Sequence, residues 1–219
     1  TVNPPGEHYD GITAQLVREL KSAGLRSRRF RVPATLLKRH LPPEQHRCPR
    51  YNVLGTRTVP GAKRTLHFNA HFDVVPVSGE WRHGSPFSGT VENGCIHGRG
   101  TADMKGSIAS LLLALRALRA TGTAPLLNLE VSFTADEETD SVLGTEWLVN
   151  HAPIKPDFAV VMEGGMDGRI CCGHNGVVWL NVIVHGRAAH GSQPQKGVNA
   201  LEKMSALVLA LEDYKRTLA

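Results

Sequence analysis

Four short stretches of the sequence carry imidazole or carboxylate side chains that could bind a metal ion. They are His71-Phe72-Asp73, Asp103, Asp136-Glu137-Glu138 and Glu163. These groups sit at or just past the ends of apolar, strand-like runs, and in an open α/β sheet the C-terminal ends of the strands form the edge where ligands bind. One histidine with several carboxylates suits zinc or a similar divalent ion. Together, the four stretches predict a two-metal hydrolase.

The pair His71 and Asp73 is more informative than either residue alone. A single histidine at the end of a strand is more often a surface or capping residue than a metal ligand. Residues i and i+2 of a strand point the same way, so Asp73 can accept a hydrogen bond from one ring nitrogen of His71 while the other nitrogen binds metal. The spacing therefore predicts that Asp73 orients His71.

The remaining carboxylates each have an ordinary alternative. Asp103, after a glycine-rich segment, could simply cap a helix, and Glu163 could be a solvated loop residue. Adjacent side chains diverge, so one residue of Glu137-Glu138 can bind metal while the other faces substrate as a general base. The coincidence of four such groups at strand ends makes the metal site the better interpretation.

The hydrophobic pattern predicts the elements that must position these groups. Strictly alternating or continuous apolar runs indicate strands, and apolar residues spaced three and four apart indicate helices. The predicted elements are helices at 13–25, 104–118 and 144–150, strands at 66–71, 127–135 and 158–162, and a loop with a short hairpin at 78–98. We expect the strand at 158–162 to be buried on both faces. The alternation predicts an α/β fold with a mostly parallel, twisted sheet flanked by helices.

The character of the sequence changes near Gly173. A strand at 177–184 and a helix at 198–215 are predicted beyond that point, too little to bury a core alone. We therefore expect a catalytic, metal-binding domain at 1–174, incomplete at its C-terminal end, and the first part of a smaller α+β domain at 175–219.

Composition narrows the possible functions. The net charge of +5 includes the arginine-rich stretch Arg26–Arg31, which could contact nucleic acid, but no aromatic interleaving or nucleic-acid motif accompanies it. A solvated basic face is the preferred interpretation, with no nucleic-acid partner. The four cysteines lack zinc-finger spacing, and Cys171-Cys172 is expected to be buried in a strand. No apolar run could span a membrane and no signal peptide is evident, so we expect a cytoplasmic protein without a membrane partner.

The motifs resemble those of the di-zinc aminoacylase, acetylornithine deacetylase, succinyl-diaminopimelate desuccinylase and carboxypeptidase G family. The similarity covers residues 3–211. It is carried by His71-Phe72-Asp73, by GRGTADMKG at 98–106, by Asp136-Glu137-Glu138, by Glu163-Gly164-Gly165 and by GRAAHGSQPQKGVNA at 186–200. The resemblance implies a zinc-peptidase-like catalytic domain followed by a lid or dimerisation domain.

The resemblance also implies a role for each site residue. His71 and Glu163 hold one Zn²⁺ ion, Glu138 holds the other, and Asp103 bridges both. Co²⁺ is a possible substitute for zinc. Asp73 orients His71, and Glu137 is the general base that takes a proton from the attacking water and passes it to the leaving amine. His190, on the lid, contacts the substrate, and a non-proline cis peptide bond follows Asp103.

The sequence departs from this family in one respect. The family's last zinc ligand is a histidine near the C-terminus, and the 219 residues stop within the first lid helix. We therefore expect a truncated form of a hydrolase that cleaves the amide bond of N-acyl amino acids or small peptides and dimerises through its lid. The alternative is a non-catalytic remnant of the fold that acts as a metal-binding or assembly partner.

Overall fold

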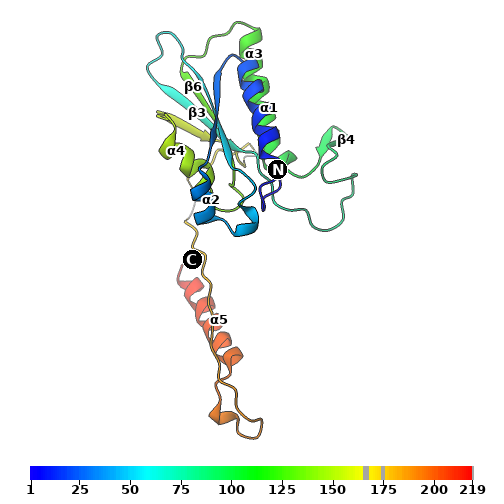
Figure 1. The fold of residues 1–219 in the computed structure, drawn as a ribbon, viewed down its shortest axis with the longest axis vertical. Helices are drawn as coiled ribbons and strands as arrows, with labels where there is room; N and C mark the ends of the chain where they lie inside the picture. Colours follow the sequence, from blue (N-terminus) through cyan, green and yellow to red (C-terminus); the bar gives the residue numbers. More distant parts are fainter. Residues whose placement is uncertain (165–167, 174–175, 219) are drawn as a thin grey trace. The chain divides into compact units, whose positions relative to one another are not determined.

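The chain folds into two compact units, Thr1–Arg169 and Ile170–Ala219. The computed structural model, drawn in Figure 1, describes residues 1–164, 168–173 and 176–218. The first unit contains the sheet and every predicted site residue except His190. Each unit is described separately below.

A five-stranded sheet forms the centre of the first unit. Its order is β1 (Arg26–Arg31), β2 (Tyr51–Arg57), β6 (Asn128–Thr134), β3 (Thr65–His71) and β7 (Phe158–Val161). The pairings of β3 with β6 and with β7 are parallel, whereas those of β2 with β1 and with β6 are antiparallel. The α/β class is confirmed, but the sheet is mixed, so the expectation of a mostly parallel sheet was wrong.

The error arose from two strands that the hydrophobic pattern did not reveal. The strand β1 has the sequence RSRRFR and lies at the edge of the sheet, where charged side chains are common because they discourage pairing with other chains. The strand β2 is buried over most of its length, and the hydrophobic pattern predicts no element there. These strands supply both antiparallel pairings.

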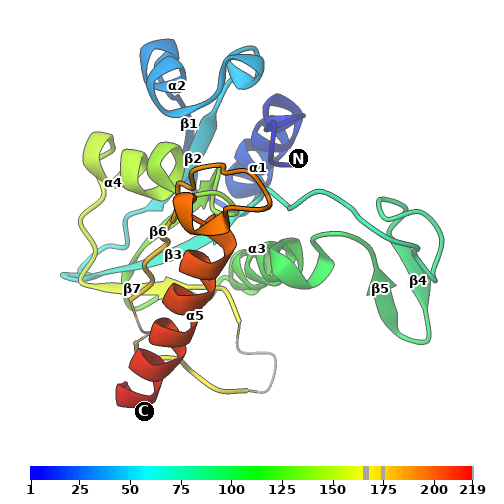
Figure 2. The same cartoon turned by 90° about the horizontal axis from the view of Figure 1, so that it is seen from below.

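Helices cover both faces of the sheet, as predicted. Figure 2 shows α1 (Tyr9–Ser22) and α3 (Gly106–Ala120) on one side and α4 (Trp147–His151) on the other. Asn52 of β2 donates its side-chain amide to the Leu143 carbonyl, which attaches the short helical segment Val142–Glu146 before α4 to the sheet. A second apolar cluster joins α4 to α2 (Ala34–His40), and a 3₁₀ turn follows at Pro43–Gln45.

The main core lies between the sheet and the pair α1 and α3. Leu20 of α1 approaches β2 so closely that a Cβ atom on Gly55 would lie 2.9 Å from Leu20 Cδ1, which explains the glycine in that strand. The apolar residues of this core are Tyr9, Leu16, Leu20, Ala23, Leu25, Tyr51, Val53, Ala70, Phe72, Met104, Ile108, Leu111, Leu112, Leu115, Leu129, Val131, Phe133 and Ala135. The alternation in β6 and the periodicity in α3 are both represented, so those two predictions are confirmed.

The strand β7 differs from its prediction. It forms at the expected residues, but Phe158, Val160 and Val161 are 46%, 43% and 63% exposed. The strand lies at the edge of the sheet and pairs only with β3 among the described residues, so a continuous apolar run here does not mean burial on both faces.

The predicted hairpin consists of β4 (Thr90–Glu92) and β5 (Cys95–His97). Asn93 and Gly94 connect the strands, both with positive φ, as a two-residue hairpin turn requires. Figures 1 and 2 both show this hairpin projecting beyond the main sheet.

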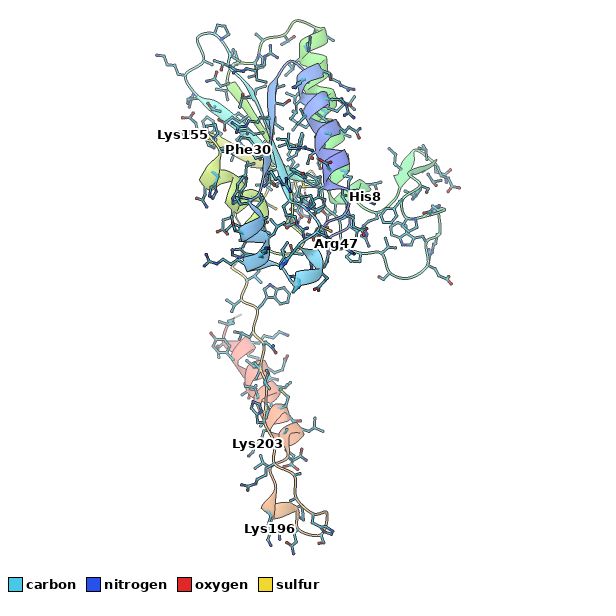
Figure 3. All side chains as sticks on the ribbon, viewed as in Figure 1. His8, Phe30, Arg47, Lys155, Lys196 and Lys203 are labelled. Atoms are coloured by element: carbon cyan, nitrogen blue, oxygen red, sulfur yellow. The ribbon has the colours of Figure 1, made fainter. Side chains whose placement is uncertain are left out.

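The second unit contains α5 (Ala200–Thr217), whose first turn is capped by the Asn199 side chain, and a 3₁₀ turn at Pro194–Lys196. Figure 3 labels Lys196 and Lys203 on this unit. Residues 177–184 form no strand, which contradicts the prediction, because the described residues of this unit offer no neighbouring strand for them to pair with. Cys171 and Cys172 are exposed instead of buried.

No helix within the described residues is long and apolar enough to cross a membrane.

Candidate metal centre

The sheet places its predicted ligands at one edge. His71 is the last residue of β3, and its ring is buried. Glu137 and Glu138 follow β6, and Glu163 follows β7, so these three stretches end neighbouring parallel strands. The C-terminal ends of parallel strands meet at one edge of the sheet, which brings residues from distant parts of the sequence together.

Asp103 reaches this edge from the segment Thr101–Lys105, which leads into α3. Asp103 and Met104 have non-helical backbone angles, and the peptide bond between them is cis, as the family resemblance implied. Met104 is buried in the core, whereas the Asp103 side chain is 59% exposed. Asp103 Oδ1 lies 3.0 Å from His71 Nε2, on the ring nitrogen that faces away from Asp73.

Asp73 contacts both the imidazole and the turn that carries the glutamates. Its Oδ1 lies 3.4 Å from His71 Nδ1, and its backbone carbonyl oxygen lies 3.2 Å from the same nitrogen. Its carboxylate also accepts hydrogen bonds from the backbone N–H groups of Glu137, at 3.3 Å, and Glu138, at 3.2 Å. Asp73 is fully buried, so one fixed carboxylate sets the position of the histidine and of the acidic pair.

The donor atoms of the site form two overlapping groups. His71, Asp103 and Glu138 offer atoms that all lie within 4.8 Å of one another, and so do His71, Glu137 and Glu163. The predicted ligands therefore converge, with Glu137 among them. As in the family-based assignment, Glu163 and Glu138 fall in different groups. The grouping differs from that assignment because Glu137 is included, His71 belongs to both groups, and Asp103 belongs to only one.

The electrostatics of His71 reflect its surroundings. Burial of the ring disfavours its charged form, but the hydrogen bond and charge of Asp73, with the charges of Glu137 and Asp103, outweigh burial and raise the pKa of His71 to about 9. Burial likewise opposes ionisation of Asp73, yet hydrogen bonds from His71 and Asn3 hold the pKa of that carboxyl below its usual value.

The two glutamates show the opposite effect. Burial raises the pKa of Glu137, and the neighbouring charge of Glu163 raises it further. Burial also raises the pKa of Glu138, with the charge of Asp103 adding to it. Carboxylates that repel one another around a single imidazole are a favourable environment for a divalent cation, which neutralises them. The donor set is oxygen-rich with one imidazole nitrogen and fits such an ion.

A buried polar network behind the site was not predicted. Arg50 Nε donates to Asp136 Oδ2 at 2.7 Å, and the hydroxyl of Tyr9 donates to Asp136 Oδ1 at 3.0 Å. Asn3 Nδ2 lies within hydrogen-bonding distance of both Asp73 Oδ2, at 3.1 Å, and Asp136 Oδ1, at 3.2 Å. The network therefore joins Asp73 to the residue that precedes the acidic pair. The only sequence signal was Asp136 itself, next to Glu137.

His190 lies in the second unit. It is exposed, and its Nδ1 forms a 2.8 Å hydrogen bond with Ser192 Oγ. Arg187 and Val198 form an isolated antiparallel bridge on either side of this segment. The predicted substrate contact of His190 remains a prediction.

The raised pKa of His71 leads to a prediction for the metal-free chain. The folded pKa of about 9 exceeds the ordinary value of 6.5, so the protonated ring stabilises the fold fully below pH 6.5, and this contribution is lost as pH rises through about 9. Urea unfolding across that range should show the loss in the wild-type chain. His71→Gln should lack this part of the pH dependence, and identical pH profiles for the two chains would contradict the prediction.

Solved structures resemble this fold over most of the chain. An M20 family metallo-carboxypeptidase from Sulfolobus solfataricus superposes with a TM-score of 0.60 and 24% identity, over 77% of this chain and 36% of the other. The aminopeptidase PepT from Bacillus cereus superposes with a TM-score of 0.58 and 20% identity, over 92% of this chain and 51% of the other. At these identities, the similarity shows the fold alone.

Proteins related in sequence are more similar to this chain than the solved structures are. A succinyl-diaminopimelate desuccinylase from Acidiphilium cryptum is 37% identical over 159 residues, which are 68% of this chain and 40% of that protein. An acetylornithine deacetylase from Pasteurella multocida is 34% identical over 206 residues, which are 93% of this chain and 50% of that protein. The chain spans half or less of the length of these relatives.

The relatives and a family match place the chain in a family of metallohydrolases. Residues 67–213 match the profile of peptidase family M20/M25/M40, a range that includes every predicted site residue from His71 to His190. The chain belongs to this family, which confirms the resemblance found in the sequence.

Proposed function

We propose that the protein hydrolyses the amide bond of N-acyl amino acids or small peptides with the help of bound metal. The observation that carries this proposal is the convergence of His71 with two overlapping carboxylate groups at the C-terminal edge of the sheet. The names of the relatives, a desuccinylase, a deacetylase and a carboxypeptidase, support the same class of reaction. Because the chain spans half or less of those relatives, the proposal concerns the whole protein to which these residues belong.

The proposed ligands are His71, Asp103, Glu138 and Glu163. They would hold two Zn²⁺ ions, with Asp103 between them, and Co²⁺ could take the place of zinc. When bound, divalent ions of this kind polarise the substrate carbonyl and lower the pKa of water. Overlap of the two donor groups at His71 supports adjacent ions, because a single residue lies close to both sets.

Glu137 is the proposed general base. Its side chain is 38% exposed, so it is accessible to substrate, and its Oε2 lies 3.7 Å from His71 Nε2. Burial and the charge of Glu163 raise its pKa, which makes the carboxylate a better proton acceptor than an ordinary glutamate. Glu137 takes a proton from the attacking water and delivers it to the nitrogen of the leaving amine.

Asp73 has a positioning role in this proposal. It holds the His71 ring through Nδ1 and the glutamate turn through two backbone N–H groups, so one side chain aligns the metal ligand with the base. We further propose that His190 contacts the substrate, that residues 175–219 begin a lid through which two chains dimerise, and that the protein acts in the cytoplasm.

An activity assay with the full reading frame tests the proposed function. The protein, loaded with Zn²⁺ or Co²⁺, should release free amine from at least one member of a panel of N-acetyl amino acids, N-succinyl amino acids and dipeptides. Removing the metal with a chelator should abolish turnover, and adding the metal back should restore it. Zinc binding without hydrolysis of any panel member would instead favour a non-catalytic, metal-binding role.

A further inference from the structure

The projecting hairpin carries a second cluster of metal-binding side chains. Side-chain donors of His83, Glu92 and His97 all lie within 4.8 Å of one another. None of these residues belongs to either group at the edge of the main sheet. The proposed amide hydrolysis assigns them no role.

Contacts between these side chains show that they already face one another. His83 Nδ1 and Glu92 Oε2 form a 2.7 Å hydrogen bond, and the rings of His83 and His97 stack with centroids 3.9 Å apart. The His83 and Glu92 side chains are 42% and 52% exposed, so an ion from solvent can reach them.

The strand register adds a thiol to the same face. Glu92 pairs with Cys95 and Thr90 pairs with His97 across the antiparallel hairpin. Directly opposed residues project to the same side, as do residues i and i+2 of a strand. Glu92, Cys95 and His97 therefore share one face of the hairpin. Cys95 is exposed and forms no disulfide.

The connecting turn holds this arrangement in register. Asn93 and Gly94 adopt the positive φ angles of a tight two-residue turn, which fixes the pairing of Glu92 with Cys95. A His₂GluCys set is a four-donor combination suited to tetrahedral zinc, with bonds of about 2.0–2.3 Å. The rings are stacked and Cys95 is outside the 4.8 Å group, so one imidazole must turn about its Cβ–Cγ bond and the Cys95 side chain must rotate toward the others for all four to bind one ion.

We propose that the β4–β5 hairpin binds a divalent transition-metal ion of the zinc type through His83, Glu92, Cys95 and His97. Imidazole and thiolate donors favour Zn²⁺ and Co²⁺ over Mg²⁺ or Ca²⁺. The strand β5 runs directly into the glycine-rich segment that ends at Asp103. A bound ion would therefore brace the chain just before a ligand of the main site.

Cobalt spectroscopy tests this site separately from the main one. Both groups at the main sheet edge contain only His, Asp and Glu, so Co²⁺ bound there cannot produce a thiolate-to-Co²⁺ charge-transfer band. Such a band would report an ion bound by a cysteine elsewhere in the chain. We expect the 219-residue chain, freed of metal and kept reduced, to develop this band when Co²⁺ is added. Cys95→Ser should lose it, and Cys171→Ser, which removes another exposed cysteine, should keep it.

Metal stoichiometry provides the second measurement. The double variant His83→Gln/His97→Gln should bind one Zn²⁺ ion fewer than the wild-type chain, or bind it at least about 10-fold more weakly. His40→Gln, which removes an exposed histidine of α2, serves as the matched control. Circular dichroism checks that each variant is folded. A charge-transfer band that survives Cys95→Ser, or zinc binding by the double variant equal to wild type, would overturn the proposal.

Discussion

Glu137→Gln should retain bound zinc while losing about two to four orders of magnitude in kcat in the full-length protein. The substitution preserves the shape of the side chain and removes its capacity to accept a proton. Glu137 lies 3.7 Å from His71 through its Oε2 but is more than a third exposed, as expected for a group that faces the substrate. Metal content by elemental analysis and steady-state kinetics on one preparation provide the two readouts.

The matched control for this experiment is Glu146→Gln. Glu146 is an exposed glutamate of the same region and lies outside both donor groups, so the change should leave kcat and metal content unaltered. An equal loss of zinc and of rate in Glu137→Gln would show that Glu137 is a metal ligand instead of the base. The experiment can distinguish the two roles because the donor atoms of Glu137, His71 and Glu163 lie within 4.8 Å of one another, close enough for Glu137 to bind a metal ion.

Arg50→Met should destabilise the chain by about 3–5 kcal/mol, because it leaves a buried carboxylate without its cation. The Arg50 and Asp136 side chains are 0% and 1% exposed, and the guanidinium also donates to the Pro5 and Cys48 carbonyls at 2.7 and 2.8 Å. Urea unfolding of the metal-free chain measures the effect. Zinc affinity should fall as well, because Asn3 connects Asp136 to Asp73.

Two further variants make this prediction specific. Arg216→Met removes an ion pair with Asp213 whose side chains are 80% and 76% exposed, and it should change stability little. Arg50→Met/Asp136→Asn removes both buried charges and should recover part of the loss. A change of less than about 1 kcal/mol in Arg50→Met would contradict the structural role of the pair.

The sequence predicted the parts of the fold that depend on local patterns. Strict alternation marked β6, and apolar residues spaced three and four apart marked α3, because each element buries a single face against the core. The candidate ligands at the ends of β3, β6 and β7 could be selected for a related reason: each lies at or just past the end of its own strand in the sequence.

Features that depend on distant residues were missed. Asn3, Tyr9 and Arg50 meet Asp136 only after the chain has folded, and no local pattern links positions more than 80 residues apart. The charge of β1 concealed an edge strand, and the apolar run of β7 concealed its exposure. Both strands lie at an edge of the sheet, and this position determines which of their side chains are exposed. The spacing of apolar residues in the sequence does not show where in the sheet a strand lies.

The most direct test of the central claim is zinc-edge anomalous diffraction from crystals of the 219-residue chain grown with zinc. We expect an anomalous peak at the C-terminal edge of the sheet, about 2.0–2.2 Å from His71 Nε2 and from a carboxylate oxygen of Asp103. Loss of this peak in His71→Ala crystals would support the assignment. Zinc-grown crystals without a peak there, in which His71, Asp103 and Glu163 point away from one another, would show that this edge is not a metal centre.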